Sequence, residues 1–206
     1  GVSAFVGEIS SGVITVAFNM IILGLAGNIG VAAYGVVANI SLVAVALFNG
    51  IAQGSQPLIS ESYGKGRMQD VRYVVGLAFK TAIGLAVIII AAIYIWSDPI
   101  ASIFNSEKNM ELASYAREGI RLYFLGFMFA GINIIGTAAL SAVEAVKWAF
   151  TASIMRGFVA ILIFAFVLSA LFGMTGVWLA FPAAELVTMT LSIIGMKKSI
   201  AVSKTT

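Results

Sequence analysis

The sequence predicts an all-α integral membrane fold with six transmembrane helices. Of its 206 residues, 61% are hydrophobic and only 10% are charged, whereas soluble domains carry roughly 25% charged residues. Charged residues are absent between Glu8 and Glu61, and again within 81–97, 122–143 and 157–184. Because about 20 apolar residues cross the hydrocarbon core as a helix, these stretches hold several crossings.

Polar or glycine-rich breaks divide the chain into six apolar segments. Lipid does not tolerate an open sheet edge, and the sequence lacks the alternation of barrel strands, so each segment is expected to be a helix. The predicted helices are 3–25, 31–60, 72–96, 122–143, 148–171 and 176–196. In the longest break, Asp98-Pro99 fits the start of a short helix, and 110–118 alternates apolar with charged residues. That alternation favours an amphipathic run in the membrane interface, which is expected to lead without a stop into the fourth crossing.

Cations are unequally shared between the two sides that this topology creates. One side has Lys65, Arg67, Arg72, Lys147, Lys197, Lys198 and Lys204, and the other has Lys108, Arg117 and Arg121. By the positive-inside rule, both chain ends are expected in the cytoplasm, in a multi-pass protein of the plasma membrane. Lys80 and Arg156 lie within apolar segments near the cytoplasmic side, where their long stems are expected to snorkel to the headgroups.

Composition excludes several classes of function. The chain has no His and no Cys, so imidazole metal sites, histidine bases and thiolate chemistry are excluded, and we expect no cofactor and no enzyme activity. The cations are scattered rather than clustered on one face, so nucleic acid is not an expected partner. The chain opens on Gly1-Val2-Ser3 without a leader, and we expect it to be a fragment of a longer polypeptide.

One face of the first segment carries the polar side chains of that segment. Glu8, Ser11, Thr15 and Asn19 are spaced by three or four residues and therefore share a helix face. An acid inside a membrane helix is a functional-site hypothesis by default, because desolvation favours its protonated form. Glu8 is therefore a candidate for proton exchange or for holding a Na⁺ ion. The alternative is a solvated position close to the helix end.

Three further segments carry polar residues at helical spacing. In the second segment these are Asn49, Gln53 and Gln56, which either line a cavity or bind neighbouring helices together. The fourth segment carries Asn133, followed by a threonine and a serine at intervals of four. The sixth carries Glu185, for which ion coupling and pairing with Arg156 are the two interpretations.

Several of these stretches together resemble a known family. They are Glu-Ile-Ser-Ser-Gly at 8–12, Gly-Asn at 27–28, the run at 30–36 with Asn39, the run from Phe48 to Ser60 with Tyr-Gly at 63–64, and Phe-Pro-Ala-Ala-Glu-Leu at 181–186. The chain resembles the C-terminal lobe of multidrug and toxic compound extrusion (MATE) transporters. The likeness runs from the first segment to the last, and Gln-Gly-Ser-Gln-Pro at 53–57 is its most specific part.

The resemblance implies a twelve-helix antiporter of two six-helix lobes, which exports cationic amphipathic compounds in exchange for Na⁺ or H⁺. Residues 1–206 would form the second lobe, and its partners would be the missing N-terminal lobe, the bilayer and small-molecule substrates. Glu8 stands where the family has a glutamate implicated in coupling and substrate binding. Many members also carry an acid in the fourth helix of this lobe, and 122–143 has none.

Two other functions are compatible with a polar-striped membrane bundle. A lipid-linked oligosaccharide flippase of the same superfamily would need a cationic cavity for pyrophosphate, for which only Lys80 and Arg156 are candidates. A structural or assembly subunit would use the polar stripes only to bind helices together.

Overall fold

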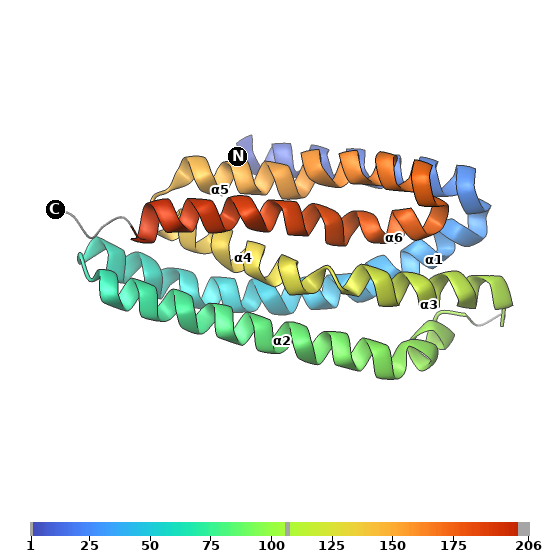
Figure 1. The fold of residues 1–206 in the computed structure, drawn as a ribbon, viewed down its shortest axis with the longest axis horizontal. Helices are drawn as coiled ribbons and strands as arrows, with labels where there is room; N and C mark the ends of the chain where they lie inside the picture. Colours follow the sequence, from blue (N-terminus) through green and yellow to red (C-terminus); the bar gives the residue numbers. More distant parts are fainter. Residues whose placement is uncertain (1, 106–107, 202–206) are drawn as a thin grey trace.

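The computed structural model describes residues 2–105 and 108–201, with side chains described for 12–105 and 108–200. All regular elements in this part of the chain are helices (Figure 1). They are α1 (Val2–Gly64), α2 (Met68–Ile103), α3 (Met110–Phe124), α4 (Phe127–Ala142), α5 (Val146–Ile154), the π-helix η1 (Met155–Val159), α6 (Ala160–Met196) and the π-helix η2 (Lys197–Ala201). The all-α fold predicted from composition is therefore confirmed.

Two glycines fold the longest helical stretches back on themselves. Gly12–Gly64 and Val146–Ile200 contain 53 and 55 residues, about twice what one crossing requires. Gly27 (φ 63°, ψ −155°) interrupts the first stretch, and Gly173 (φ 58°, ψ −135°) interrupts the second. These backbone angles are essentially restricted to glycine. Figure 1 shows the chain reversing at both places, so each stretch makes two antiparallel crossings.

The remaining crossings are α2 and the pair α3 and α4. The 36 residues of α2 are long enough for one span, and α3 with α4 forms another across a bend of 45°. Together with the two divided stretches, this gives the six predicted helices. The start of α1 and the end of α6 lie toward the same end of the elongated bundle (Figure 1).

The expectation that 110–118 lies flat in the interface is wrong. α3 runs along the bundle toward α4 (Figure 1), and it contacts α1, α2 and α6. Ala116, Gly119 and Ile120 of α3 are buried in these contacts. The amphipathic pattern therefore reflects a helix with one face packed on the bundle and one face exposed. α3 also begins with a local cap, because the Asn109 side chain accepts hydrogen bonds from the backbone N–H groups of Glu111 and Leu112.

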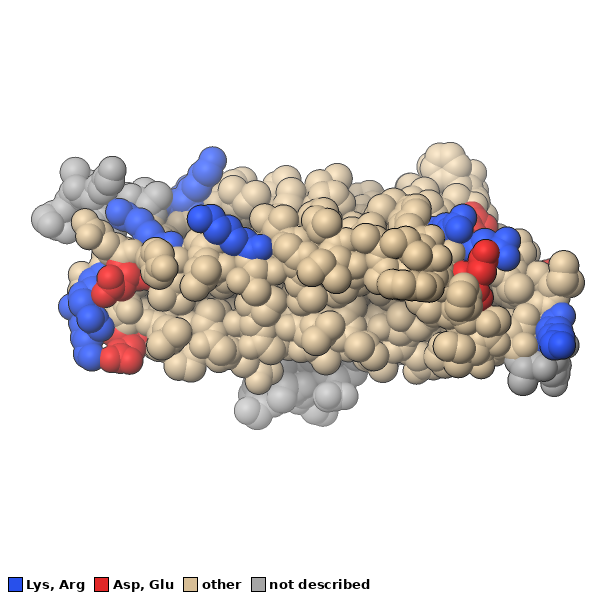
Figure 2. Space-filling model, turned by 90° about the horizontal axis from the view of Figure 1, so that it is seen from below, with Lys and Arg blue, Asp and Glu red and all other residues tan. Residues whose placement is uncertain are grey.

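On the face drawn in Figure 2, charged side chains gather toward the two ends of the bundle. Figure 2 shows an uncharged belt between clusters of Lys, Arg, Asp and Glu at either end of the long axis. At one end Arg67 pairs with Asp70 at 3.5 Å, and at the other Arg117 pairs with Asp98. The belt matches the hydrocarbon core of a bilayer, where charged side chains are costly.

α1 and α4 pack closely together where a glycine of α4 faces an aromatic ring of α1. Phe48 of α1 is fully buried and stacks on Phe127 of α4 with ring centroids 5.9 Å apart. A Cβ atom on Gly131 would lie 2.7 Å from the Phe48 ring. In a membrane, where apolar burial gives little driving force, such tight packing is what holds helices together.

Gly27→Ala tests the reversal in α1. An L-residue at this backbone conformation is strained by about 1 to 3 kcal/mol, so the melting temperature of the purified protein in detergent should fall by several degrees. Gly24→Ala is the matched control, because Gly24 is helical and nothing lies within 4 Å of its added Cβ. A melting temperature for Gly27→Ala equal to that of Gly24→Ala would contradict the assigned reversal.

Candidate functional site

A polar cavity of about 490 Å³ lies among α1, α4, the α5–η1 segment and α6. Its volume is in the range of sites that hold drug-sized molecules. Apolar side chains, including Ile14, Ile161 and Phe181, form part of its wall. Its polar lining consists of Asn49, Gln53, Gln56, Thr137, Ser141, Ser153, Arg156 and Glu185.

A buried ion pair forms one wall of this cavity. The Arg156 Nε–H donates to Glu185 Oε1 at 2.5 Å, and the Glu185 side chain is only 2% exposed while that of Arg156 is 26% exposed. A carboxylate buried inside a membrane bundle is costly unless it is paired and hydrogen-bonded. Of the two interpretations of Glu185, the structure therefore shows the pairing with Arg156. Arg156 does not follow the snorkelling expectation, because its guanidinium is directed to this acid.

Asn133 completes the hydrogen bonding of Glu185. Its Nδ2 donates to Glu185 Oε2 at 2.7 Å and to the Glu185 backbone carbonyl at 2.8 Å, while its Oδ1 accepts from the Ser192 hydroxyl at 2.9 Å. Asn133 and Ser192 are both fully buried. These bonds join α4 to α6, and together with the bond from Arg156 they give each carboxylate oxygen of Glu185 a donor.

The π-helix η1 presents Arg156 to the cavity. A π-helical turn contains one extra residue, which rotates the side chains that follow, and such turns are frequent at functional sites. η1 spans Met155–Val159, and both Arg156 and Gly157 line the cavity. The absence of a side chain on Gly157 leaves space beside the guanidinium.

An aromatic stack supports the cavity from the side of α6. Phe181, which lines the cavity, stacks on Tyr123 with ring centroids 4.3 Å apart. Gly126 permits this arrangement, because a Cβ atom there would lie 2.5 Å from the Phe181 ring. The apolar wall of the cavity is thus fixed in position by packing between the α3–α4 bend and α6.

The structure brings some of the predicted site residues together and separates others. Asn49, Gln53, Gln56 and Glu185 line the cavity, and Asn133 lies behind it as a hydrogen-bonding partner of Glu185. From the first half of α1, the cavity is lined by Ile14. Thr15 on that helix is exposed and Asn19 is half-buried. The side chains of Glu8 and Ser11 lie outside the described part of the structure.

Sequence reasoning missed Ser153 and Gly157 as cavity-lining residues. Their spacing from Arg156 places all three on one helix face within an otherwise apolar segment. For Arg156 the sequence left two interpretations, snorkelling and pairing with Glu185, and the structure shows the pairing.

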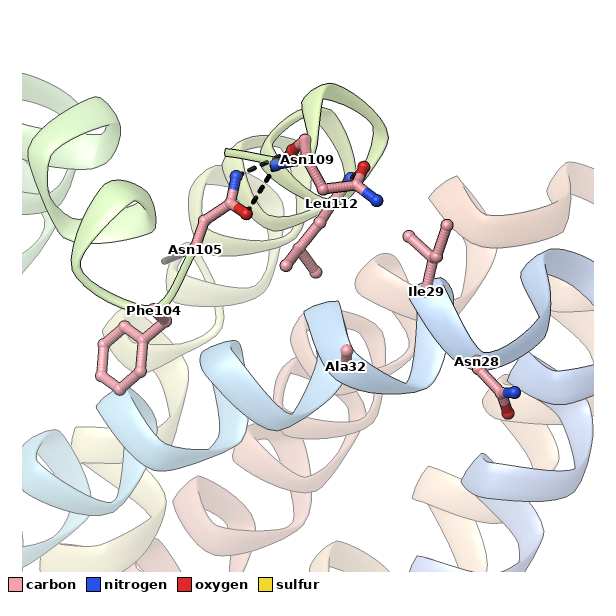
Figure 3. A pocket seen from close by; sticks show the side chains of 7 residues that line it. All are labelled: Asn28, Ile29, Ala32, Phe104, Asn105, Asn109 and Leu112. Carbon is pink, nitrogen blue, oxygen red and sulfur yellow. Dashed lines mark hydrogen bonds between the residues drawn. The ribbon is translucent and has the colours of Figure 1, made fainter. Parts of the chain in front are cut away.

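A second, smaller cavity lies near the connection between α2 and α3 (Figure 3). It has a volume of about 250 Å³ and is lined by Asn28, Ile29 and Ala32 of α1 and by Phe104, Asn105, Asn109 and Leu112. Asn105 and Asn109 hydrogen-bond to each other through side chain and backbone, as the dashed lines in Figure 3 mark. Since Asn109 also caps α3, these asparagines stabilise the connection.

A bundle of six apolar helices with a polar cavity between them defines a membrane-embedded lobe of the kind from which transporters are built. The sequence profile of the MatE family matches residues 4–167, and the chain belongs to this family. Membership confirms the resemblance seen in the sequence.

Named relatives and solved structures agree with this assignment. The chain is 26% identical over 188 residues to the multidrug export protein MepA of Staphylococcus aureus (strain bovine RF122 / ET3-1), covering 90% of this chain and 40% of that protein. It superposes with a TM-score of 0.89 on an inward-facing multidrug resistance MATE family transporter, at 18% identity over 97% of this chain and 46% of that one. An outward-facing structure of such a transporter gives 0.88, at 17% identity, over 97% and 45%. The chain therefore spans less than half the length of these relatives.

Asn133→Leu tests the role of the buried network. The substitution leaves Glu185 Oε2 and the Ser192 hydroxyl without the partner that Asn133 provides, at a cost of about 1 to 3 kcal/mol, and more where the acceptor is charged. The melting temperature in detergent should fall markedly. Asn39→Leu is the control, since Asn39 is exposed on α1, and its melting temperature should stay near that of the wild type. Equal stability of the two variants would show that the network contributes nothing.

Proposed function

We propose that this chain is the C-terminal lobe of a two-lobe, twelve-helix multidrug exporter. The observation that carries the proposal is the polar cavity, whose lining comes from helices far apart in the sequence. Multidrug export is what the names of the MepA relatives state for those proteins. Because the family is one of transporters, we propose no catalytic activity for the chain.

The exposed polar side chains of the cavity are evidence that a second lobe covers this face. Gln53, Ser141 and Ser153 are exposed in the lobe as it stands, and Gln53 belongs to a helix whose other exposed residues are largely apolar. Lipid contact with such amide and hydroxyl groups is unfavourable, whereas a water-filled cavity between two lobes accommodates them. We propose that this face meets the N-terminal lobe and that the substrate passes between the two.

Coupling to Na⁺ or H⁺ is assigned to Glu8. Glu185 is already held by Arg156 and Asn133, so its charge is compensated before any ion binds. Among the described residues no three His, Cys, Asp or Glu side chains cluster as a metal site. Glu8 is the other acid within the predicted polar stripes, and we propose that its partner is an exchangeable ion or a cationic substrate. The wider stripe of Ser11, Thr15 and Asn19 would supply further oxygen ligands.

Export then follows from differential binding. A substrate or an ion shifts the equilibrium between inward-open and outward-open states only by the difference in its affinity for the two. Protonation of Glu8, or Na⁺ binding to it, would remove the negative charge that holds a cationic amphipathic substrate. The excess of Lys and Arg at one end of the bundle supports cytoplasmic placement of both chain ends in the plasma membrane.

The flippase alternative has less support from the geometry. A pyrophosphate carries several negative charges and calls for several cations, but Arg156 is the one cation among the described lining residues of the large cavity. Lys80 is exposed on α2 and does not belong to that lining. The structural-subunit alternative is also less supported, because Asn49, Gln53 and Gln56 line the cavity instead of only binding helices together.

Gln53→Ala tests the proposed function. In cells that express the complete transporter, loss of one hydrogen-bonding amide from the cavity should change export of some probes by about 2- to 10-fold, and should leave others and the protein level unchanged. Ethidium and two chemically different dyes would be followed by fluorescence. Gln69→Ala is the control, because Gln69 is exposed at the start of α2 away from the cavity. If the complete wild-type protein exports none of the probes, multidrug export is refuted.

Glu8→Gln tests the coupling assignment. The amide mimics the protonated acid with little change in volume, so export against a concentration gradient should stop while the amount of folded protein is maintained. Glu8→Asp keeps the charge but shortens the side chain by one methylene, and partial activity is expected. Export would be measured in everted vesicles with a Na⁺ gradient or a proton gradient imposed separately. Uphill export by Glu8→Gln at the wild-type rate would move the coupling site elsewhere.

A further inference from the structure

The ion pair at the cavity wall presents its positive member to the cavity. Glu185 is 2% exposed and both of its carboxylate oxygens already accept hydrogen bonds, one from Arg156 and one from Asn133. Arg156 is 26% exposed and uses only its Nε–H in this network. Within the described structure, its two Nη groups donate to no acceptor. A ligand entering the cavity therefore meets guanidinium N–H groups, with the carboxylate behind them.

The neighbouring polar groups extend this donor surface. The side-chain amides of Asn49 and Gln53 and the hydroxyl of Ser153 line the same cavity and can all donate hydrogen bonds. The described lining contains no acid other than Glu185. The planar fork of an arginine matches a carboxylate and forms two parallel charge-assisted bonds with it. Gly157 beside Arg156 leaves room for such a group to approach.

Charge balance limits which ligands suit the cavity. Arg156 and Glu185 together carry no net charge, so this end of the cavity offers a purely cationic ligand no net attraction. A phosphate brings an excess of negative charge to a single arginine. A zwitterion places its carboxylate on the Nη groups and carries its own compensating cation. Inside a site of low dielectric, where unpaired charge is costly, net neutrality is favourable.

We infer that the Arg156 end of this cavity is a carboxylate-binding subsite, which binds the carboxylate of zwitterionic amphipathic substrates while their cationic group lies elsewhere in the site. The inference rests on the proposed export function and names the substrate class of the same site. The apolar side chains of Ile14, Ile161 and Phe181 line the cavity as well, and they would receive the hydrophobic body of such a molecule. Arg156 acts here through direct contact with the ligand.

The test compares two dyes that differ in one group. Rhodamine 110 carries a free carboxylate and a delocalised cation, and rhodamine 123 is its methyl ester, which is a simple cation. Binding of each to the purified complete transporter is measured by fluorescence anisotropy. Because Arg156→Gln alone would leave Glu185 unpaired and could prevent folding, the principal variant is Arg156→Gln with Glu185→Gln, which stays neutral. Arg156→Lys keeps the charge but loses the fork, and Lys80→Gln is the control that removes an exposed cation away from the cavity.

The double variant should weaken rhodamine 110 binding by about tenfold or more, and should leave rhodamine 123 within about twofold. Arg156→Lys should give an intermediate loss for rhodamine 110, and Lys80→Gln should change neither dye. Melting temperatures and size-exclusion profiles verify that each variant is folded.

Equal weakening of both dyes would overturn the inference, as would loss of rhodamine 123 alone, unchanged binding of both dyes, or a wild-type protein that binds rhodamine 123 but not rhodamine 110. In these cases the proposed export function would stand. If the folded wild-type transporter neither bound nor exported either dye or ethidium, the export function itself would fail, and the subsite with it.

Discussion

Compensating the Glu185 carboxylate is the constraint around which the lobe is organised. An acid that is only 2% exposed inside an apolar membrane bundle needs both a counter-ion and hydrogen-bond donors. Arg156 reaches it from η1 and Asn133 reaches it from α4, so one side chain of α6 fixes the relative placement of three helical segments. The cavity lies directly beside this junction. Its position and its exposed charge therefore follow from how one buried acid is neutralised.

Local sequence signals were sufficient for the fold and for part of the site. Gly27 and Gly173 lie at the two breaks predicted from composition, because a tight reversal of a membrane helix needs backbone angles that only glycine adopts at low cost. Asn49, Gln53 and Gln56 meet in one cavity because their spacing follows the helical period. These features depend on residues close together in the chain, and such patterns can be recognised without knowing which helices become neighbours.

The remaining features depend on contacts between distant segments. Asn133 and Ser192 are 59 residues apart, and nothing local indicates that α4 and α6 place them at hydrogen-bonding distance. For α3, the same amphipathic pattern suits a helix in the interface or one packed on a bundle, and only the neighbouring helices decide between them. For Arg156 the sequence left snorkelling and pairing open for the same reason, since its choice between headgroup and acid depends on where Glu185 lies.

The internal ties of the lobe also bear on how it can move. It superposes almost equally well on an inward-facing and an outward-facing transporter structure, with TM-scores of 0.89 and 0.88. The fold of this chain is therefore close to both of these solved structures, and in the two-lobe exporter that we propose such a unit would move as a whole, with little repacking inside it. The ion pair and the stacked aromatic rings favour this, because separating them would expose an unpaired charge or break tight packing. In that proposed exporter, a ligand held on the wall of such a unit would be carried with it, and its binding energy would drive the transition only through contacts made on the opposite lobe in one of the two states.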